Sequence, residues 1–172
     1  MIVLDARTAT PHFPGVGRYT RELARALSKS VDLALIVNPL QSGIERDLWS
    51  LPARRISVPH NPRSVAQQWV LPQRLRGLKA AVYHSPFYLM PYFPGVPSVV
   101  TVYDLIPLHP ASGTPPAQQA AYGMAHRLAF MAARRTEPAG SSAESVIDTL
   151  RLRLLRMVSG SDTTSSSTRD VH

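Results

Sequence analysis

Short apolar runs rich in β-branched residues recur between residues 2 and 103, and each ends in polar or turn-forming residues. Runs of this length are typical of strands that are buried on both faces of a parallel sheet. The predicted strands cover residues 2–4, 33–37, 56–58, 80–83 and 98–103.

Apolar residues at helical spacing lie between and after these runs. They predict a helix that begins near Arg18, a second over residues 64–76 and a third over residues 117–135. Pro72 should kink the second helix or end its first half, because proline lacks the backbone N–H that a helix interior needs. Strands that alternate with helices predict an α/β fold, a Rossmann-like parallel sheet flanked by helices.

The chain changes character after residue 135. Residues 137–142 are typical of a linker, residues 144–157 can form an amphipathic helix, and the serine- and threonine-rich end from residue 159 is predicted to be disordered. We therefore divide the chain into a Rossmann-like domain over 1–135 and a divergent tail over 136–172.

The length and charge of the chain limit the kinds of binding partner that we expect. The 172 residues suffice for one α/β domain, and the formal net charge of +8 comes almost entirely from arginines that are spread along the chain. A nucleic-acid surface needs a clustered basic patch, so we do not expect a nucleic-acid partner, and an arginine-rich binder is the third interpretation.

The chain has no cysteine, and its six histidines are not at the spacing of zinc sites, so we expect neither a metal nor another cofactor. No apolar run approaches the roughly 18 residues of a membrane span. The predicted location is the cytoplasm, with peripheral contact at the inner membrane surface left open.

Two glycines precede the first predicted helix, in the segment His12 to Gly17. Gly15 and Gly17 would let backbone N–H groups approach an anion, which the helix N-terminus and Arg18 would attract. The same pattern also serves as a tight turn, so both interpretations stay open.

Polar residues end two of the predicted strands. His84 and Ser85 follow one, and Tyr103 and Asp104 follow another. Parallel sheets bind ligands beyond the carboxyl ends of their strands, so these residues are candidates for contacts with ligand hydroxyl groups. The alternative is that Asp104 caps a turn and His84 is a satisfied loop residue.

Three phrases carry a family resemblance: LDARTATPHFPGVGRYTRELARAL, VYHSPFYLMPYFPGVPSVVTVYDLIPLHP and AAYGMAHRLAFMAARR. Together, over residues 1–135, they resemble the N-terminal domain of retaining glycosyltransferases of the group 1 (family 4) type. The resemblance implies a GT-B fold, two Rossmann-like domains across a cleft, and transfer of a sugar from a nucleotide-sugar donor to an acceptor.

The resemblance also implies roles for the candidate residues. It places Gly15 and Gly17 beside the donor phosphates and the acceptor, and it places His84, Ser85, Tyr103 and Asp104 along the acceptor side of the cleft. Many relatives carry a histidine that faces the transferred sugar where this chain has Tyr103. Tyr103 and Asp104 are therefore cleft candidates, and we assign no catalytic residue.

The resemblance ends at about Arg135. Relatives continue with another strand and a second domain that holds the nucleotide diphosphate, and we expect both to be missing from a truncated chain that is inactive alone. The cationic groups that stabilise the leaving diphosphate come largely from that domain. We also expect the loss of the strand and of the domain interface to leave apolar surface exposed.

The expected partners are a nucleotide-sugar, an unidentified glycosyl acceptor and a separate chain that supplies the C-terminal domain. The alternative interpretation is a non-catalytic protein-interaction module that docks a partner through the sheet face and the helix predicted over 144–157.

Overall fold

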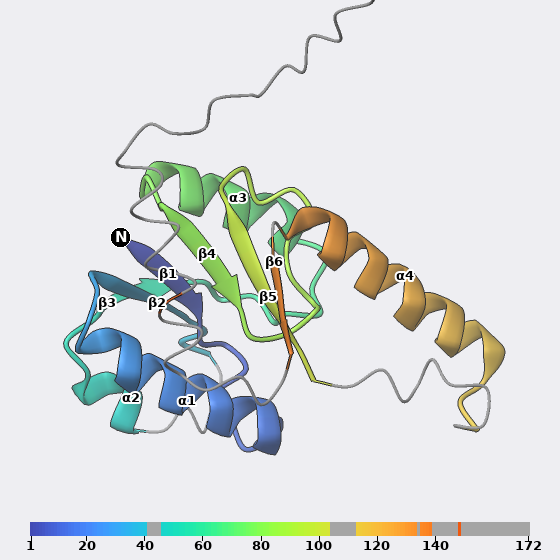
Figure 1. Cartoon of the computed structure of the whole chain (residues 1–172), viewed down its shortest axis with the longest axis horizontal. Coiled ribbons are helices and arrows are strands. Elements are labelled where there is room, and N and C mark those ends of the chain that lie inside the picture. The colour runs from blue at the N-terminus through green and yellow to red at the C-terminus, as the bar shows by residue number, and fades with distance from the viewer. Residues whose placement is uncertain (41–45, 104–112, 134, 139–147, 149–172) are drawn as a thin grey trace, which may run out of the picture.

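The computed structural model describes residues 1–40, 46–103, 113–133, 135–138 and 148, and these form one parallel sheet between two layers of helices (Figure 1). The strands in this part of the chain are β1 (Ile2–Asp5), β2 (Leu33–Val37), β3 (Arg54–Ser57), β4 (Val82–Ser85), β5 (Ser98–Val102) and β6 (Arg135–Pro138). The helices are α1 (Pro14–Ser28), α2 (Arg46–Ser50), α3 (Gln67–Gly77) and α4 (Pro116–Ala132). The predicted α/β, Rossmann-like class is confirmed.

The strand order is β3-β2-β1-β4-β5-β6, and every neighbouring pair is parallel. This is the doubly wound order in which the chain builds outward from β1 in one direction and then returns to build outward in the other. The order reverses between β1 and β4, so the carboxyl ends of these two strands mark the point where such sheets bind ligands.

The core lies on both faces of the sheet because successive strand residues point to opposite sides. Ile2 and Leu4 pack into a cluster with Leu27 of α1, whereas Val3 packs into a second cluster with Leu75 of α3. Figure 1 shows α1 and α2 on one side of the sheet and α3 and α4 on the other.

All three predicted helices differ from those observed. The helix predicted over 117–135 is α4, which ends at Ala132, and Arg135 belongs to β6. Helix α1 begins at Pro14 rather than near Arg18, because proline is favoured in the first turn of a helix, where no N–H partner is needed. Helix α3 does not end at Pro72 but continues to Gly77, with Leu71, Pro72 and Leu75 buried. Tertiary packing of this face outweighs the hydrogen bond that proline removes.

The expectation that the sheet lacks its last strand is wrong. Residues 135–138, where we predicted the end of a helix at 135 and a linker from 137, form β6, paired in register from Val99 with Arg135 to Val102 with Pro138. An edge strand is held through one neighbour and tolerates proline, so it needs no apolar alternation to pair. Residues 139–147 and 149–172, which include nearly all of the helix predicted over 144–157, lie outside the described residues.

Candidate functional site

A buried ion pair stands at the carboxyl end of β1. The Arg7 side chain is fully buried, and it donates from Nε to Asp5 Oδ1 (2.9 Å) and from Nη2 to Asp5 Oδ2 (2.6 Å). Its remaining donors reach Gln67 Oε1 of α3 at 2.9 Å and the backbone oxygen of His60 at 3.0 Å. The guanidinium therefore ties the end of β1 to α3 and to the segment before it.

Tyr83 of β4 completes this cluster across the point where the strand order reverses. Its hydroxyl donates to Asp5 Oδ2 at 2.9 Å. Burial and the Asp5 carboxylate raise the pKa of Tyr83 well above its usual value, so it stays a neutral donor. Burial alone would lower the pKa of Arg7, but the Asp5 carboxylate outweighs it and raises that pKa. Both Asp5 oxygens are thus occupied by internal partners, which removes this carboxylate as a general base.

His84 lies on the opposite face of the sheet, also buried. Its Nε2 lies 2.9 Å from Thr101 Oγ1 of β5, which in turn lies 3.2 Å from the Tyr19 hydroxyl of α1. Burial lowers the pKa of His84 to about 3, so the ring is neutral at physiological pH. The predicted site residue His84 therefore links β4 to β5 and, through Thr101, to α1. Its side chain is fully buried.

The two glycines predicted to form a loop lie in the first turn of α1, and this corrects the prediction. Gly15 is exposed, with open space where a Cβ would stand, and Arg18 is exposed beside it. Gly17 is buried, and a Cβ there would meet the backbone oxygens of Thr10 at 2.9 Å and of Thr8 at 3.1 Å. Gly17 is therefore required for close packing, and only Gly15 borders open space.

The other predicted residues end β4 and follow β5. Ser85 is buried and donates to the backbone oxygen of Phe87 at 2.6 Å, which closes the turn after β4. The Tyr103 hydroxyl is buried and has no hydrogen-bond partner among the described residues, and burial raises the pKa of Tyr103 well above its usual value. The roles predicted for these side chains stay predictions. Asp104 lies outside the described residues.

An aromatic cavity of about 200 Å³ opens at the carboxyl end of β5. It is lined by Phe87, Tyr88, Thr101, Val102, Tyr103, Tyr122 and His126. Tyr88 stacks on His126 with ring centroids 4.1 Å apart, and it meets Tyr122 edge-on at 5.0 Å. The loop after β4, the end of β5 and helix α4 thus form the walls.

This cavity was missed in the sequence because its residues come from three distant segments. One local signal existed: Tyr122 and His126 are four residues apart on one predicted helix, which places them on the same face. His126 is buried, and its Nδ1 lies 3.0 Å from the backbone oxygen of Tyr122. Because a carbonyl can only accept, Nδ1 carries the proton.

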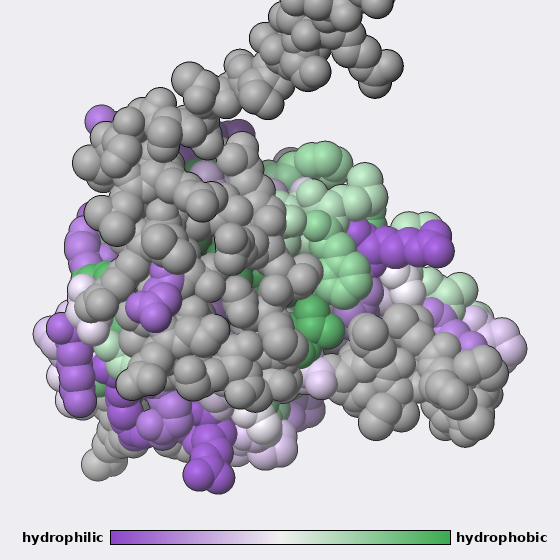
Figure 2. Space-filling model, viewed as in Figure 1, coloured by the Kyte–Doolittle hydropathy of each residue, from purple (hydrophilic) through white to green (hydrophobic). Residues whose placement is uncertain are grey.

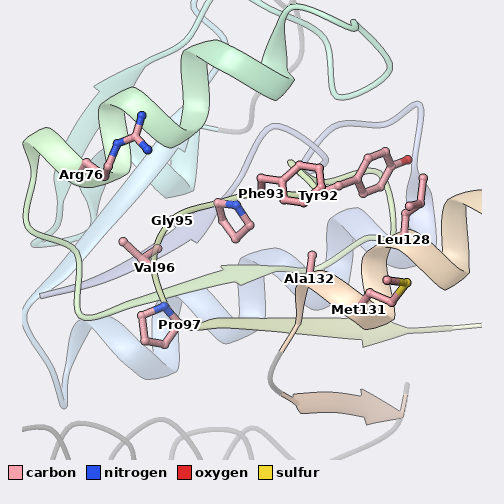
Figure 3. A pocket seen from close by; sticks show the side chains of 10 residues that line it. Arg76, Tyr92, Phe93, Gly95, Val96, Pro97, Leu128, Met131 and Ala132 are labelled. Atoms are coloured by element: carbon pink, nitrogen blue, oxygen red, sulfur yellow. The ribbon is translucent and has the colours of Figure 1, made fainter.

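A larger hollow of about 550 Å³ lies at the other end of the strands, beside the amino end of β5 (Figure 3). Arg76 at the end of α3, the segment from Tyr92 to Pro97 and the last turns of α4 line it. Phe93 and Met131 beside it are 84% and 83% exposed, and Figure 2 shows apolar residues gathered on the side that carries α3 and α4. Ligands of doubly wound sheets bind at the carboxyl ends of the strands, so this surface at their amino ends suits a macromolecular contact better than catalysis.

A third hollow, of about 510 Å³, lies beside β3 and is bordered by Arg54, Arg55 and Arg74. Arg55 is already engaged, since its Nη2 donates to the backbone oxygens of Leu48 and Leu51 near α2. Two exposed arginines remain as a basic surface at this edge of the sheet.

Among the described residues, no group of three or more histidine, aspartate or glutamate side chains is placed to hold a metal ion. Within the same part of the chain, no helix is long and apolar enough to cross a membrane.

Comparisons with family models, curated proteins and solved structures returned no match to this chain.

Proposed function

We propose that this chain supplies the acceptor-side half of a sugar-transfer site of the GT-B type, in which a second domain holds the nucleotide-sugar donor. The observation that carries the proposal is the aromatic cavity at the carboxyl edge of a doubly wound sheet. Ligands bind this edge in such sheets, and aromatic walls beside hydroxyl groups suit a ring with an apolar face and a polar rim. The resemblance of residues 1–135 to group 1 glycosyltransferases supports the same function.

In this proposal the chain alone does not catalyse transfer. A leaving diphosphate needs cationic groups or oriented dipoles aimed at its developing charge. The predicted phosphate-side cation Arg18 is an exposed side chain in the second turn of α1. Arg7, at the end of β1, is enclosed and bound to Asp5. Most of the cationic groups that hold the diphosphate therefore come from another domain, and the first turns of α1 supply the contacts that remain on this chain. We propose that the activity is cytoplasmic. The chain has no cysteine, so its fold requires no disulfide bond and no oxidising compartment.

The test is saturation-transfer NMR on the full chain with a panel of sugar nucleotides. The expected result is stronger saturation transfer to the protons of the transferred sugar than to those of the base and ribose, with no hydrolysis of the donor. Gly15→Glu places a carboxylate on the exposed first turn of α1, where it should weaken binding of the diphosphate without disturbing the fold. Saturation confined to the nucleobase, or no binding by a folded chain, would refute the proposal.

The second candidate function is a protein-interaction module, and the exposed Phe93 and Met131 favour it. An apolar surface of this kind, at the edge of the sheet away from the cavity, is typical of a docking site. This candidate predicts a stable complex with a protein partner that Phe93→Ser disrupts, and no affinity for sugar nucleotides.

A further inference from the structure

We propose that the aromatic cavity between β5 and α4 binds one pyranose ring of a glycoside, stacked against the rings of Tyr88, Tyr122 and His126. This inference rests on the proposed function and deepens it, because it names the ligand chemistry and the wall that recognises it. It concerns the cavity and not the first turn of α1.

The shape of the cavity argues for a single ring. Its volume of about 200 Å³ is below the roughly 300–1,000 Å³ of sites that enclose drug-sized ligands, and about seven times the volume per molecule of liquid water. A nucleotide-sugar does not fit inside this volume. One six-membered ring does.

The walls argue for a ring with an apolar face. Tyr88 and His126 stack within 4.1 Å, and Tyr122 and His126 lie 4.2 Å apart, so three rings form one rigid cluster. Phe87 extends it, with its centroid 4.4 Å from that of Tyr88. A pyranose presents C–H groups on its faces and hydroxyl groups around its rim, and it can cover such a wall while its hydroxyl groups reach polar partners.

The polar groups of the cavity argue against a purely apolar ligand. Tyr88 and Tyr122 carry phenol hydroxyls and are half-buried. Burial raises the pKa of Tyr88 above its usual value, although the nearby charge of Arg63 opposes this, so the hydroxyl stays protonated and can donate. Tyr103 also lines the cavity, and its hydroxyl is buried without a hydrogen bond to the described residues.

The test is an NMR titration of the full chain with methyl α-glucopyranoside, methyl α-galactopyranoside and methyl α-mannopyranoside. The expected dissociation constant for the best glycoside is on the order of 1 mM, as ordinary ligand efficiency allows for so small a ligand. Tyr122→Leu should weaken binding at least about threefold, since it removes one aromatic wall. Tyr88→Phe keeps the ring and should weaken binding by up to about tenfold through the lost hydroxyl.

The matched control is Phe93→Ala, which changes an exposed aromatic residue at the other edge of the sheet and should leave binding unchanged. Cyclohexanol and adenosine test the two other ligand classes. Equal binding of cyclohexanol would overturn the proposal in favour of an apolar crevice, and tighter binding of adenosine would overturn it in favour of a base-stacking site. Absence of glycoside binding, or binding indifferent to both tyrosine substitutions, would also overturn it.

The two proposals fail in different ways. If sugar nucleotides bind with a response to Gly15→Glu while methyl glycosides do not bind, the cavity assignment fails and the proposed function stands. If methyl glycosides bind with a response to Tyr88→Phe while no sugar nucleotide binds, the cavity assignment stands and sugar transfer fails.

Discussion

Replacing Arg7 with methionine is expected to lower the free energy of unfolding by about 3–5 kcal/mol, the usual result of removing one partner of a buried ion pair. Arg7 donates four side-chain hydrogen bonds, to Asp5, Gln67 and the backbone oxygen of His60, from a fully buried position. Methionine fills most of the volume of the arginine side chain. The loss of stability therefore comes from the Asp5 carboxylate, which stays buried without its cation, rather than from a cavity. Domains are stable by about 5–15 kcal/mol, so this is a large fraction of the total.

The assay is urea unfolding followed by circular dichroism, on the single variant and on Asp5→Asn combined with Arg7→Met. The double variant should lose less than the sum of the single losses, because the amide removes the buried charge that the single substitution orphans. Arg18→Met is the matched control on an exposed arginine and should change stability by no more than about 0.5 kcal/mol. A loss below about 1 kcal/mol for Arg7→Met would refute the reasoning.

Three further predictions concern single side chains. Gly17→Ala should destabilise the chain by about 1–3 kcal/mol through contact with the backbone of Thr10, whereas Gly15→Ala should be neutral or stabilise it by up to about 1 kcal/mol, both measured by urea unfolding. Tyr103→Phe should raise the free energy of unfolding by about 1 kcal/mol, because it removes a buried hydroxyl that has no partner in the described part of the chain; a loss of stability would contradict this. The folded pKa of His84, about 3, lies below the ordinary 6.5, so the unfolded chain binds the extra proton. The free energy of unfolding should therefore fall by roughly 1 kcal/mol per pH unit as the pH drops from about 6.5 towards 3. His84→Gln should flatten the dependence of the free energy of unfolding on pH, measured at pH 7, 5.5 and 4.5. An unchanged dependence would show that His84 is not its source.

The central sheet could be predicted from the sequence because a parallel strand buried on both faces must be apolar along its length. The runs at 2–4 and 33–37 meet this condition and both form strands. The strand β6 could not be predicted in this way, because an edge strand is fixed by backbone pairing with β5 rather than by apolar side chains. The continuation of α3 past Pro72 to Gly77 could not be predicted, because the burial of Leu71 and Leu75 in the core is a tertiary effect.

The candidate site was harder to predict, since its contacts join distant segments. Arg7 meets Gln67 sixty residues away, and Asp5 meets Tyr83 seventy-eight residues away. The one local sign was an aspartate and an arginine two residues apart at the end of an apolar strand, where buried charges require partners. The glycines were predicted to form a loop, whereas both lie in α1, where Gly17 packs closely against the backbone of Thr8 and Thr10.

The position of the buried cluster explains why the open cavity lies beside β5. In a doubly wound sheet the crevice opens where the strand order reverses, here between β1 and β4. On the face that carries α3, this chain fills that place with its own side chains, because Asp5 accepts from both Arg7 and Tyr83. The next strand along, β5, is where the aromatic cavity opens at the same edge. The fold therefore supplies the edge, and the side chains decide which strand of that edge a ligand can reach.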